Sequence, residues 1–212
     1  VKACHDNGVQ TLYAPVSNST SVAETAMLLI LECSRNVTLL HKTWVDDYYK
    51  AKLKIRKNTL NGKTLGLIGC GNIGSRLAVR ALAMEMNVLA YDPYKPAADF
   101  PDGVEVVRDL DRIFKESDYV SLHTPNTPVT KNLVDKNRLA MMKPTAFLIN
   151  TARGGCVVEE DLYEACKNGV IAGAGLDAIR KEPVDPANPL LTLDNVIIYP
   201  HIGGNRVEAA HR

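Results

Sequence analysis

Short apolar runs alternate with amphipathic stretches over most of the chain from Thr64 onward. Several of the runs are almost continuously apolar, which is typical of parallel strands that are covered on both faces. The pattern predicts seven strands, over residues 64–69, 87–92, 104–107, 119–124, 147–152, 173–178 and 195–200.

The stretches between these runs have apolar positions at helical spacing. They predict helices over residues 72–84, 110–117, 135–142 and 159–169. Repeated alternation of strand and helix predicts an α/β fold, with a doubly wound parallel sheet that carries helices on both faces.

A long helical pattern precedes the first of these strands. It runs from about Ser21 to Leu40, and Ser19, Thr20 or Ser21 could serve as its N-cap.

The segment after this helix, "HKTWVDDYYKAKLKIRKN", is charged but carries Trp44, Tyr48 and Tyr49. These aromatic side chains could belong partly to the core or could form a subunit contact. Large amphipathic rings on a charged segment favour the contact.

Residues 1–20 have the pattern of the end of a different unit. A helix finishes there, a turn follows at Asn7-Gly8, and a short strand is expected over residues 9–14. The chain starts without methionine and stops inside a helix that has just begun, so we expect a fragment of a longer protein.

The overall composition is that of a globular protein. Of the 212 residues, 46% are hydrophobic and 23% are charged, and the net charge is +1. A near-neutral net charge does not indicate binding to nucleic acid or to an anionic membrane. No apolar run approaches the roughly 20 residues that span a bilayer, and nothing resembles a signal peptide. We therefore expect neither a nucleic-acid nor a membrane partner.

The five cysteines are odd in number, scattered, and form no C-x-x-C pair. We therefore expect no disulfide framework and no metal site, and a cytoplasmic location. Cys156 could be a thiol nucleophile, but no His or Asp that would activate it lies beside it in the sequence.

One glycine motif closes the first strand of the alternation. In "LIGCGNIG", Gly69, Gly71 and Gly74 have the G-x-G-x-x-G spacing that lets a loop and a helix N-terminus hold a pyrophosphate. Asp92 ends the next predicted strand, where a carboxylate would accept hydrogen bonds from ribose hydroxyls and repel a 2′-phosphate. The motif therefore predicts a dinucleotide site that prefers NAD to NADP.

Ligands of such a sheet bind outside the carboxyl ends of its strands. His123 follows the fourth predicted strand, and we interpret it as structural because a stronger candidate histidine follows. Asp177 ends the sixth strand, where its carboxylate could reach a nicotinamide carboxamide or could cap a turn.

Three ionisable residues at the last strand ends form a possible catalytic set: Arg153, Glu182 and His201. Reduction of a 2-keto acid needs a cation for the carboxylate, and the arginine fork binds carboxylates bidentately. It also needs a proton donor that works near neutral pH, which histidine provides. A carboxylate beside the histidine fixes its orientation and tautomer.

The chain resembles the D-isomer-specific 2-hydroxyacid dehydrogenase family, and most nearly its phosphoglycerate dehydrogenase and hydroxypyruvate reductase branch. The resemblance lies in the segments "SVAE", "GKTLGLIGCGNIG", "YDPY", "LHTPNTPVT", "MKPTAFLINTARGG", "AGAGLDA", "EP" and "NVIIYPHIGG", which follow one another in family order over about residues 10–205.

This resemblance implies that Arg153 holds the keto acid, that His201 is the acid/base and that Glu182 is its partner. It also implies NAD as cofactor and a homodimer built on the long helix and the aromatic segment. The implied cofactor contacts, beyond the three loop glycines, are Asn72, Ile73, Asp92, Thr124, Pro125, Thr151, Ala152, Asp177, Gly203 and Gly204.

The resemblance also implies a division of the chain. Residues 1–20 would be a remnant of a flavodoxin-like substrate domain, residues 21–205 the Rossmann-type NAD-binding domain, and residues 206–212 the start of a truncated C-terminal helix. The family's upstream substrate loop is missing, and Arg206 replaces a small hydroxyl residue.

We therefore expect an NAD-dependent oxidoreductase that interconverts a small D-2-hydroxy acid and its 2-keto acid, of the 3-phosphoglycerate or glycerate/hydroxypyruvate type. Two alternatives stay open. The parent protein could be an NAD(H)-sensing regulator or corepressor on the same fold, and the chain alone could be a non-catalytic cofactor-binding fragment.

Overall fold

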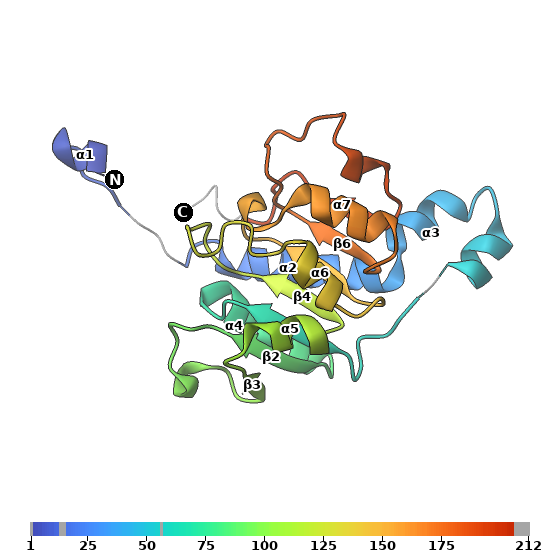
Figure 1. Cartoon of the computed structure of the whole chain (residues 1–212), viewed down its shortest axis with the longest axis horizontal. Helices are drawn as coiled ribbons and strands as arrows, with labels where there is room; N and C mark the ends of the chain where they lie inside the picture. The colour runs from blue at the N-terminus through green and yellow to red at the C-terminus, as the bar shows by residue number, and fades with distance from the viewer. Residues whose placement is uncertain (1, 13–15, 56, 206–212) are drawn as a thin grey trace.

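The computed structural model describes residues 2–12, 16–55 and 57–205. Its centre is one parallel sheet with helices on both faces (Figure 1). The seven strands are β1 (Thr64–Ile68), β2 (Asn87–Tyr91), β3 (Val104–Val106), β4 (Tyr119–Leu122), β5 (Phe147–Asn150), β6 (Gly173–Leu176) and β7 (Val196–Ile198). All seven predicted strands are confirmed, and each ends one or two residues earlier than the apolar pattern predicts.

The sheet has the strand order β3-β2-β1-β4-β5-β6-β7. β1 lies between β2 and β4, with Leu65 in register with Val88 on one side and Tyr119 on the other. The chain therefore winds outward from β1 in one direction and then from β4 in the other. Such a reversal opens a crevice at the carboxyl ends of the two central strands, where ligands of this fold bind.

Two layers of helices cover the sheet. α2 and α4 contact each other on one face, and α5, α6 and α7 form a row on the other face (Figure 1). The helices are α1 (Lys2–Asp6), α2 (Ser19–Arg35), α3 (Val37–Thr43), α4 (Asn72–Ala83), α5 (Leu110–Glu116), α6 (Lys136–Met141) and α7 (Glu159–Lys167). Short helical turns are η1 (Lys50–Lys54), η2 (Ala97–Asp99), η3 (Gly154–Cys156) and η4 (Pro189–Thr192).

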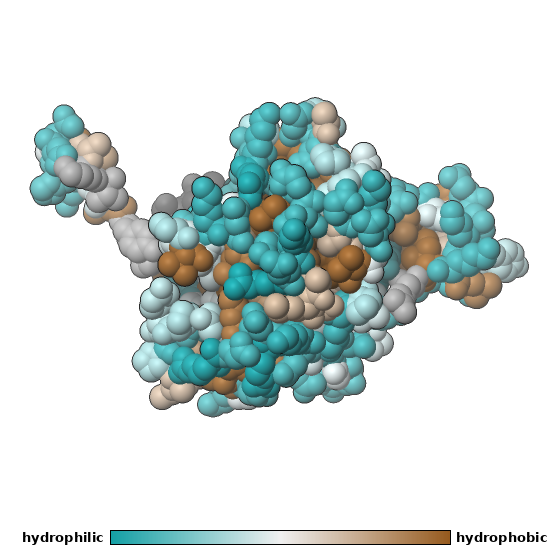
Figure 2. Space-filling model, in the orientation of Figure 1, coloured by the Kyte–Doolittle hydropathy of each residue, from teal (hydrophilic) through white to brown (hydrophobic). Residues whose placement is uncertain are grey.

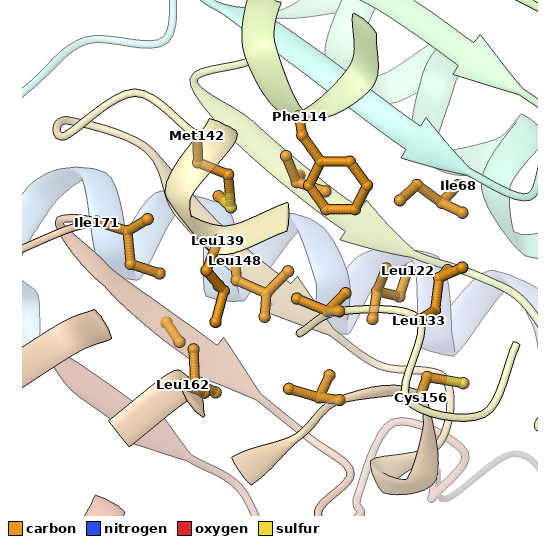
Figure 3. Packing of buried hydrophobic residues seen from close by; sticks show 14 of the residues in the cluster. Ile68, Phe114, Leu122, Leu133, Leu139, Met142, Leu148, Cys156, Leu162 and Ile171 are labelled. Carbon is orange, nitrogen blue, oxygen red and sulfur yellow. The ribbon is translucent and has the colours of Figure 1, made fainter. Parts of the chain in front are cut away.

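Each helical layer has its own hydrophobic cluster against the sheet. Beneath α5, α6 and α7, the rings and branched chains of Phe114, Leu139 and Leu162 pack over Leu148 of β5 (Figure 3). Beneath α2 and α4, Leu29 and other apolar residues pack on the opposite face of the same strands. Burial on both faces explains why the strands are continuously apolar.

The long N-terminal helix differs from its prediction. α2 begins at Ser19 after Asn18, so none of the three predicted residues is the N-cap. It ends at Arg35 because Asn36 adopts a left-handed conformation with φ 51°, which asparagine tolerates better than most residues. A separate helix, α3, then continues to Thr43.

The predicted strand over residues 9–14 is wrong for residues 9–12, which form no strand. Leu12 is 92% exposed, and α1 lies away from the sheet (Figure 1), so this segment has no sheet edge to pair with. Residues 13 and 14, the predicted helix over residues 206–212 and Arg206 lie outside the described residues.

α3 and η1 form an arm that projects from the opposite side of the molecule from α1 (Figure 1). The arm carries several large exposed side chains: Trp44, Val45, Tyr48, Tyr49 and Leu53. Figure 2 shows brown, hydrophobic patches on this arm among hydrophilic residues. In the part of the chain that the structure describes, no helix has the length and apolar character needed to cross a membrane.

Candidate active site and cofactor cleft

The glycine loop joins β1 to α4, and two of its glycines are required by close backbone approaches. Gly69 has φ +92°, and a Cβ there would lie 2.6 Å from the carbonyl oxygen of His123. A Cβ at Gly74 would overlap the carbonyl oxygen of Gly69. Gly71, in contrast, faces open space. The loop is therefore pressed against the β4 loop and the start of α4, and it leaves its middle accessible to a ligand.

Asp92 follows β2 and holds the glycine loop in place. One carboxylate oxygen accepts a hydrogen bond from the backbone N–H of Cys70 at 3.0 Å, and the other accepts from the N–H of Tyr94 at 3.0 Å. Because each carboxylate oxygen has two lone pairs, both can still accept from a ligand hydroxyl.

A cleft of about 330 Å³ opens at the carboxyl ends of β1, β2 and β4, where the strand order reverses. Its size is in the range of small-molecule sites. It is lined by Ile68, Gly69, Gly71, Tyr91, Asp92, Pro93, Tyr94, Leu110, His123, Thr124, Pro125, Thr127, Val129, Thr130 and Leu133. The cleft thus brings together five residues predicted to contact the cofactor, from three separate loops. Asn72, Ile73 and Gly74 begin α4 directly beside it.

His123 lines this cleft and is partly buried, with its Nδ1 shielded from solvent. Its Nε2 lies 2.9 Å from the hydroxyl of Ser121, and its Nδ1 has no partner in the described structure. Burial lowers the pKa of His123 from 6.5 to about 4. The imidazole is therefore neutral near pH 7, which supports its interpretation as a structural residue.

The loop after β5 carries Thr151, Ala152 and Arg153. Asn150 organises it, since its side chain accepts from the N–H of Ala152 and donates to the carbonyl oxygens of Arg153 and Ala178. Thr151 is 6% exposed, and its hydroxyl has no hydrogen-bond partner in the described structure. Arg153 is exposed, and its Nη1 donates to the carbonyl oxygen of Ala152 at 2.7 Å.

Glu182 and His201 are in direct contact. Nδ1 of His201 lies 2.7 Å from Oε2 of Glu182, while Oε1 of Glu182 accepts from the N–H of Ile179 at 3.3 Å. The two side chains are 39% and 43% exposed, so the pair is open to a ligand. Nε2 of His201 makes no hydrogen bond to other described residues.

Among the described residues, Arg153 forms no hydrogen bond or ion pair with His201 or Glu182, but its loop is tied to theirs. Gly154 lies so close to the backbone of Ile179 and Arg180 that any Cβ would overlap it. Because Ile179 also donates to Glu182, the arginine loop and the Glu182–His201 pair share one backbone support.

Asp177 is 2% exposed and holds the loop after β7. Its two carboxylate oxygens accept from the N–H groups of Ile202 and Gly203, each at 2.8 Å. The structure therefore shows the turn-capping role that the sequence left open. Gly204 lies beside Asn18 at the start of α2.

Cys156 is fully buried beneath this edge, with its sulfur 3.9 Å from the hydroxyl of Thr124. Burial raises the pKa of the Cys156 thiol. A buried thiol that stays protonated is a poor nucleophile, which argues against the thiol alternative.

Two supporting residues were missed in the sequence. Asn150 is the single polar residue of the run "FLIN", a signal that a strand-end amide binds backbone groups. Lys95, three residues after Asp92, donates to the glycine loop, and nothing in its sequence context distinguishes it from a surface lysine.

The sequence matches a known protein family. The family model described as D-isomer specific 2-hydroxyacid dehydrogenase, NAD binding domain, matches residues 27–203. The chain belongs to this family.

Individual members agree with this. The chain is 44% identical to a hydroxypyruvate reductase of Thermotoga maritima, covering 100% of this chain and 69% of that protein. It is 41% identical to a D-3-phosphoglycerate dehydrogenase of Methanocaldococcus jannaschii, covering 99% of this chain but 40% of that protein. Among solved structures, a D-lactate dehydrogenase of Lactobacillus jensenii with NAD⁺ matches with a TM-score of 0.87 and 31% identity, over 99% of this chain and 67% of that one.

The residues at this edge fit NAD, the cofactor of the matched domain. The open middle of the glycine loop suits a diphosphate, and the Asp92 carboxylate suits ribose hydroxyls. The partnerless hydroxyl of Thr151 is a buried polar group that a bound cofactor could satisfy.

The lowered pKa of His123 should make the stability of the fold depend on pH. The folded-state pKa of His123 is lower than its unfolded-state value, so the unfolded chain binds more protons between pH 6.5 and 4. The stability of the fold therefore decreases as the pH is lowered through that window. Between pH 7 and pH 5 we expect His123 to cost about 2 kcal/mol of unfolding free energy.

Urea unfolding at the two pH values measures this loss. His123→Gln should lose about 2 kcal/mol less than the wild type, whereas His5→Gln, at an exposed position, should behave like the wild type. An equal loss in wild type and His123→Gln would contradict the burial of a neutral imidazole.

Proposed function

We propose that the protein carrying this chain interconverts a small D-2-hydroxy acid and its 2-keto acid with NAD, with 3-phosphoglycerate or glycerate/hydroxypyruvate as the substrate type. The observation that carries the proposal is the 2.7 Å contact between His201 and Glu182, at the same sheet edge as the glycine loop. The names of the relatives above, all dehydrogenases or reductases, support catalysis rather than a regulator or corepressor.

The cofactor would be held by backbone groups and two carboxylates. The diphosphate would lie at the start of α4, because unpaired N–H groups there attract anions. It would face Gly69, Gly71, Asn72, Ile73 and Gly74. Asp92 would bind the ribose. The cleft of about 330 Å³ that Thr124 and Pro125 line would hold the adenosine, and we call it the adenosine cleft. When bound, NADH supplies the hydride. Its nicotinamide would lie against Thr151, Ala152, Asp177, Gly203 and Gly204.

Proton transfer would fall to His201. With Nδ1 bound to Glu182, the imidazole is fixed in one orientation and presents Nε2 to the substrate. As hydride reaches the carbonyl carbon of a 2-keto acid, the oxygen gains charge and takes the Nε2 proton, giving the hydroxyl group. Oxidation of the hydroxy acid runs through the same steps in reverse.

Arg153 would bind the substrate carboxylate. Its fork can form two parallel hydrogen bonds, and those bonds would also orient the carbonyl toward His201. The contact of Arg153 with the carbonyl oxygen of Ala152 uses one nitrogen and leaves other N–H donors for the substrate.

His201→Ala in the whole protein should reduce kcat for keto-acid reduction by about 10²–10⁴-fold, because general acid catalysis contributes that much. NADH affinity should stay the same, since the imidazole is assigned to the substrate. His5→Ala, at an exposed position on α1 and outside the arm, is the matched control.

The assay follows NADH oxidation with hydroxypyruvate, 3-phosphohydroxypyruvate, glyoxylate and pyruvate, and the preferred substrate identifies the branch. Activity of His201→Ala within a few-fold of the wild type would disprove the role of His201. Binding of NADH without turnover of any 2-keto acid would instead favour a cofactor-sensing protein.

We also propose that the protein is cytoplasmic and forms a homodimer through the long helix α2 and the arm that follows it. Large exposed side chains cluster on the arm, with Tyr49 and Leu53 each 72% exposed, and such a cluster is typical of a protein–protein contact. Five free cysteines suit a reducing compartment. Residues 1–20 are proposed as the remnant of the substrate domain, residues 21–205 as the NAD-binding domain and residues 206–212 as the start of a further helix.

A charge placed on the arm should separate the dimer. In sedimentation equilibrium, Tyr49→Glu/Leu53→Glu should be monomeric at concentrations where the wild type is dimeric, since burying unpaired carboxylates in an interface is costly. Leu12→Glu, at an exposed site outside the arm, should stay dimeric. A wild type that is monomeric would contradict the proposal.

A further inference from the structure

Lys95 reaches from the loop after β2 back to the glycine loop. Its ammonium group donates to the carbonyl oxygen of Cys70 at 2.7 Å and to the hydroxyl of Ser75 at 2.9 Å. The same hydroxyl donates to the Cys70 carbonyl oxygen at 2.9 Å. One carbonyl of the loop thus receives two hydrogen bonds, one of them from a cation.

These contacts complete a clamp on a single residue. The N–H of Cys70 donates to Asp92, and its carbonyl oxygen accepts from Lys95 and Ser75. The orientation of both peptide groups around Cys70 is therefore fixed by two residues of the loop after β2, Asp92 and Lys95, and by Ser75 of α4. The next residue, Gly71, is the one that faces open space.

The clamp borders a second hollow of about 460 Å³, which shares Gly71, Asp92 and Tyr94 with the adenosine cleft. Its lining contains two cations, Lys95 and Arg76, and two carboxylates, those of Asp92 and Asp99. Arg76 donates to the carbonyl oxygen of Asn72 at 2.8 Å, so both cations bind backbone oxygens at the start of α4. Their charge adds to the positive end of that helix.

The ammonium group of Lys95 also lies over an aromatic ring. Its nitrogen lies 5.1 Å from the centre of the Phe100 ring, a cation–π distance, and the side chain is partly buried. A lysine that is already ordered loses little further conformational freedom when an anion binds nearby.

We propose that Lys95 is a positioning residue for the cofactor diphosphate: it fixes the Cys70–Gly71 peptide toward the ligand and supplies a fixed positive charge at the loop. This inference rests on NAD binding at the glycine loop. It assigns diphosphate affinity to a side chain outside the glycine motif.

The test compares Lys95→Met with the wild type by calorimetric titration of NADH, ADP and adenosine. Methionine keeps an unbranched side chain but removes the charge and the donors. Affinity for NADH and ADP should fall about tenfold, which corresponds to loss of one charge-assisted hydrogen bond, while affinity for adenosine stays the same.

Three further variants sharpen the result. Lys95→Arg should recover most of the ADP affinity because the charge returns. Ser75→Ala should lose less than Lys95→Met because Lys95 keeps its direct bond to Cys70. Lys63→Met should bind all three ligands like the wild type, since Lys63 precedes β1 at the opposite edge of the sheet.

Unchanged ADP affinity in Lys95→Met would overturn the proposal. An equal loss for ADP and adenosine would overturn it too, because Lys95 would then shape the adenosine cleft rather than hold the diphosphate. A wild type that binds no NADH would refute the cofactor site itself, which separates that failure from failure of the Lys95 assignment.

Discussion

The site depends on one constraint, the parallel direction of all seven strands. Because every strand runs the same way, the loops after β1, β2, β4, β5, β6 and β7 leave the sheet at one edge. Residues that are separated by more than 100 positions, such as Gly69 and His201, therefore share that edge. The reversal of strand order between β1 and β4 then opens the cleft in which Asp92 and Thr124 meet.

Close backbone approach turns this shared edge into a defined geometry. Gly69 and Gly154 each bring one loop against the backbone of another, where a Cβ would overlap. Buried side chains then fix the loops by hydrogen bonds to backbone groups: Asn150 holds the arginine loop, and Asp177 holds the loop after His201. The exposed Arg153 and the Glu182–His201 pair are carried by this rigid frame, which suits groups that must meet a substrate in a fixed orientation.

The sheet and its first crossover can be predicted from the sequence because the patterns that identify them are local. Continuous apolar runs identify all seven strands, and the glycine spacing together with Asp92 identifies the first crossover. Features that depend on tertiary contacts cannot be predicted from such local patterns. The break at Asn36 comes from one left-handed residue, and residues 9–12 have strand-like composition but no partner strand. Likewise, Lys95 differs from a surface lysine only through the carbonyl oxygen that it meets.

The most direct test of the account is an NMR titration of the chain with NAD⁺, observing the histidine ring resonances assigned through single His→Gln variants. If the cofactor lies along the carboxyl edge, the resonances of His123 and His201 should shift with one common saturation curve. Those of His5 and His41, on α1 and α3, should stay in place. Saturable NAD⁺ binding that leaves His201 unmoved would contradict the placement of the cofactor beside the Glu182–His201 pair.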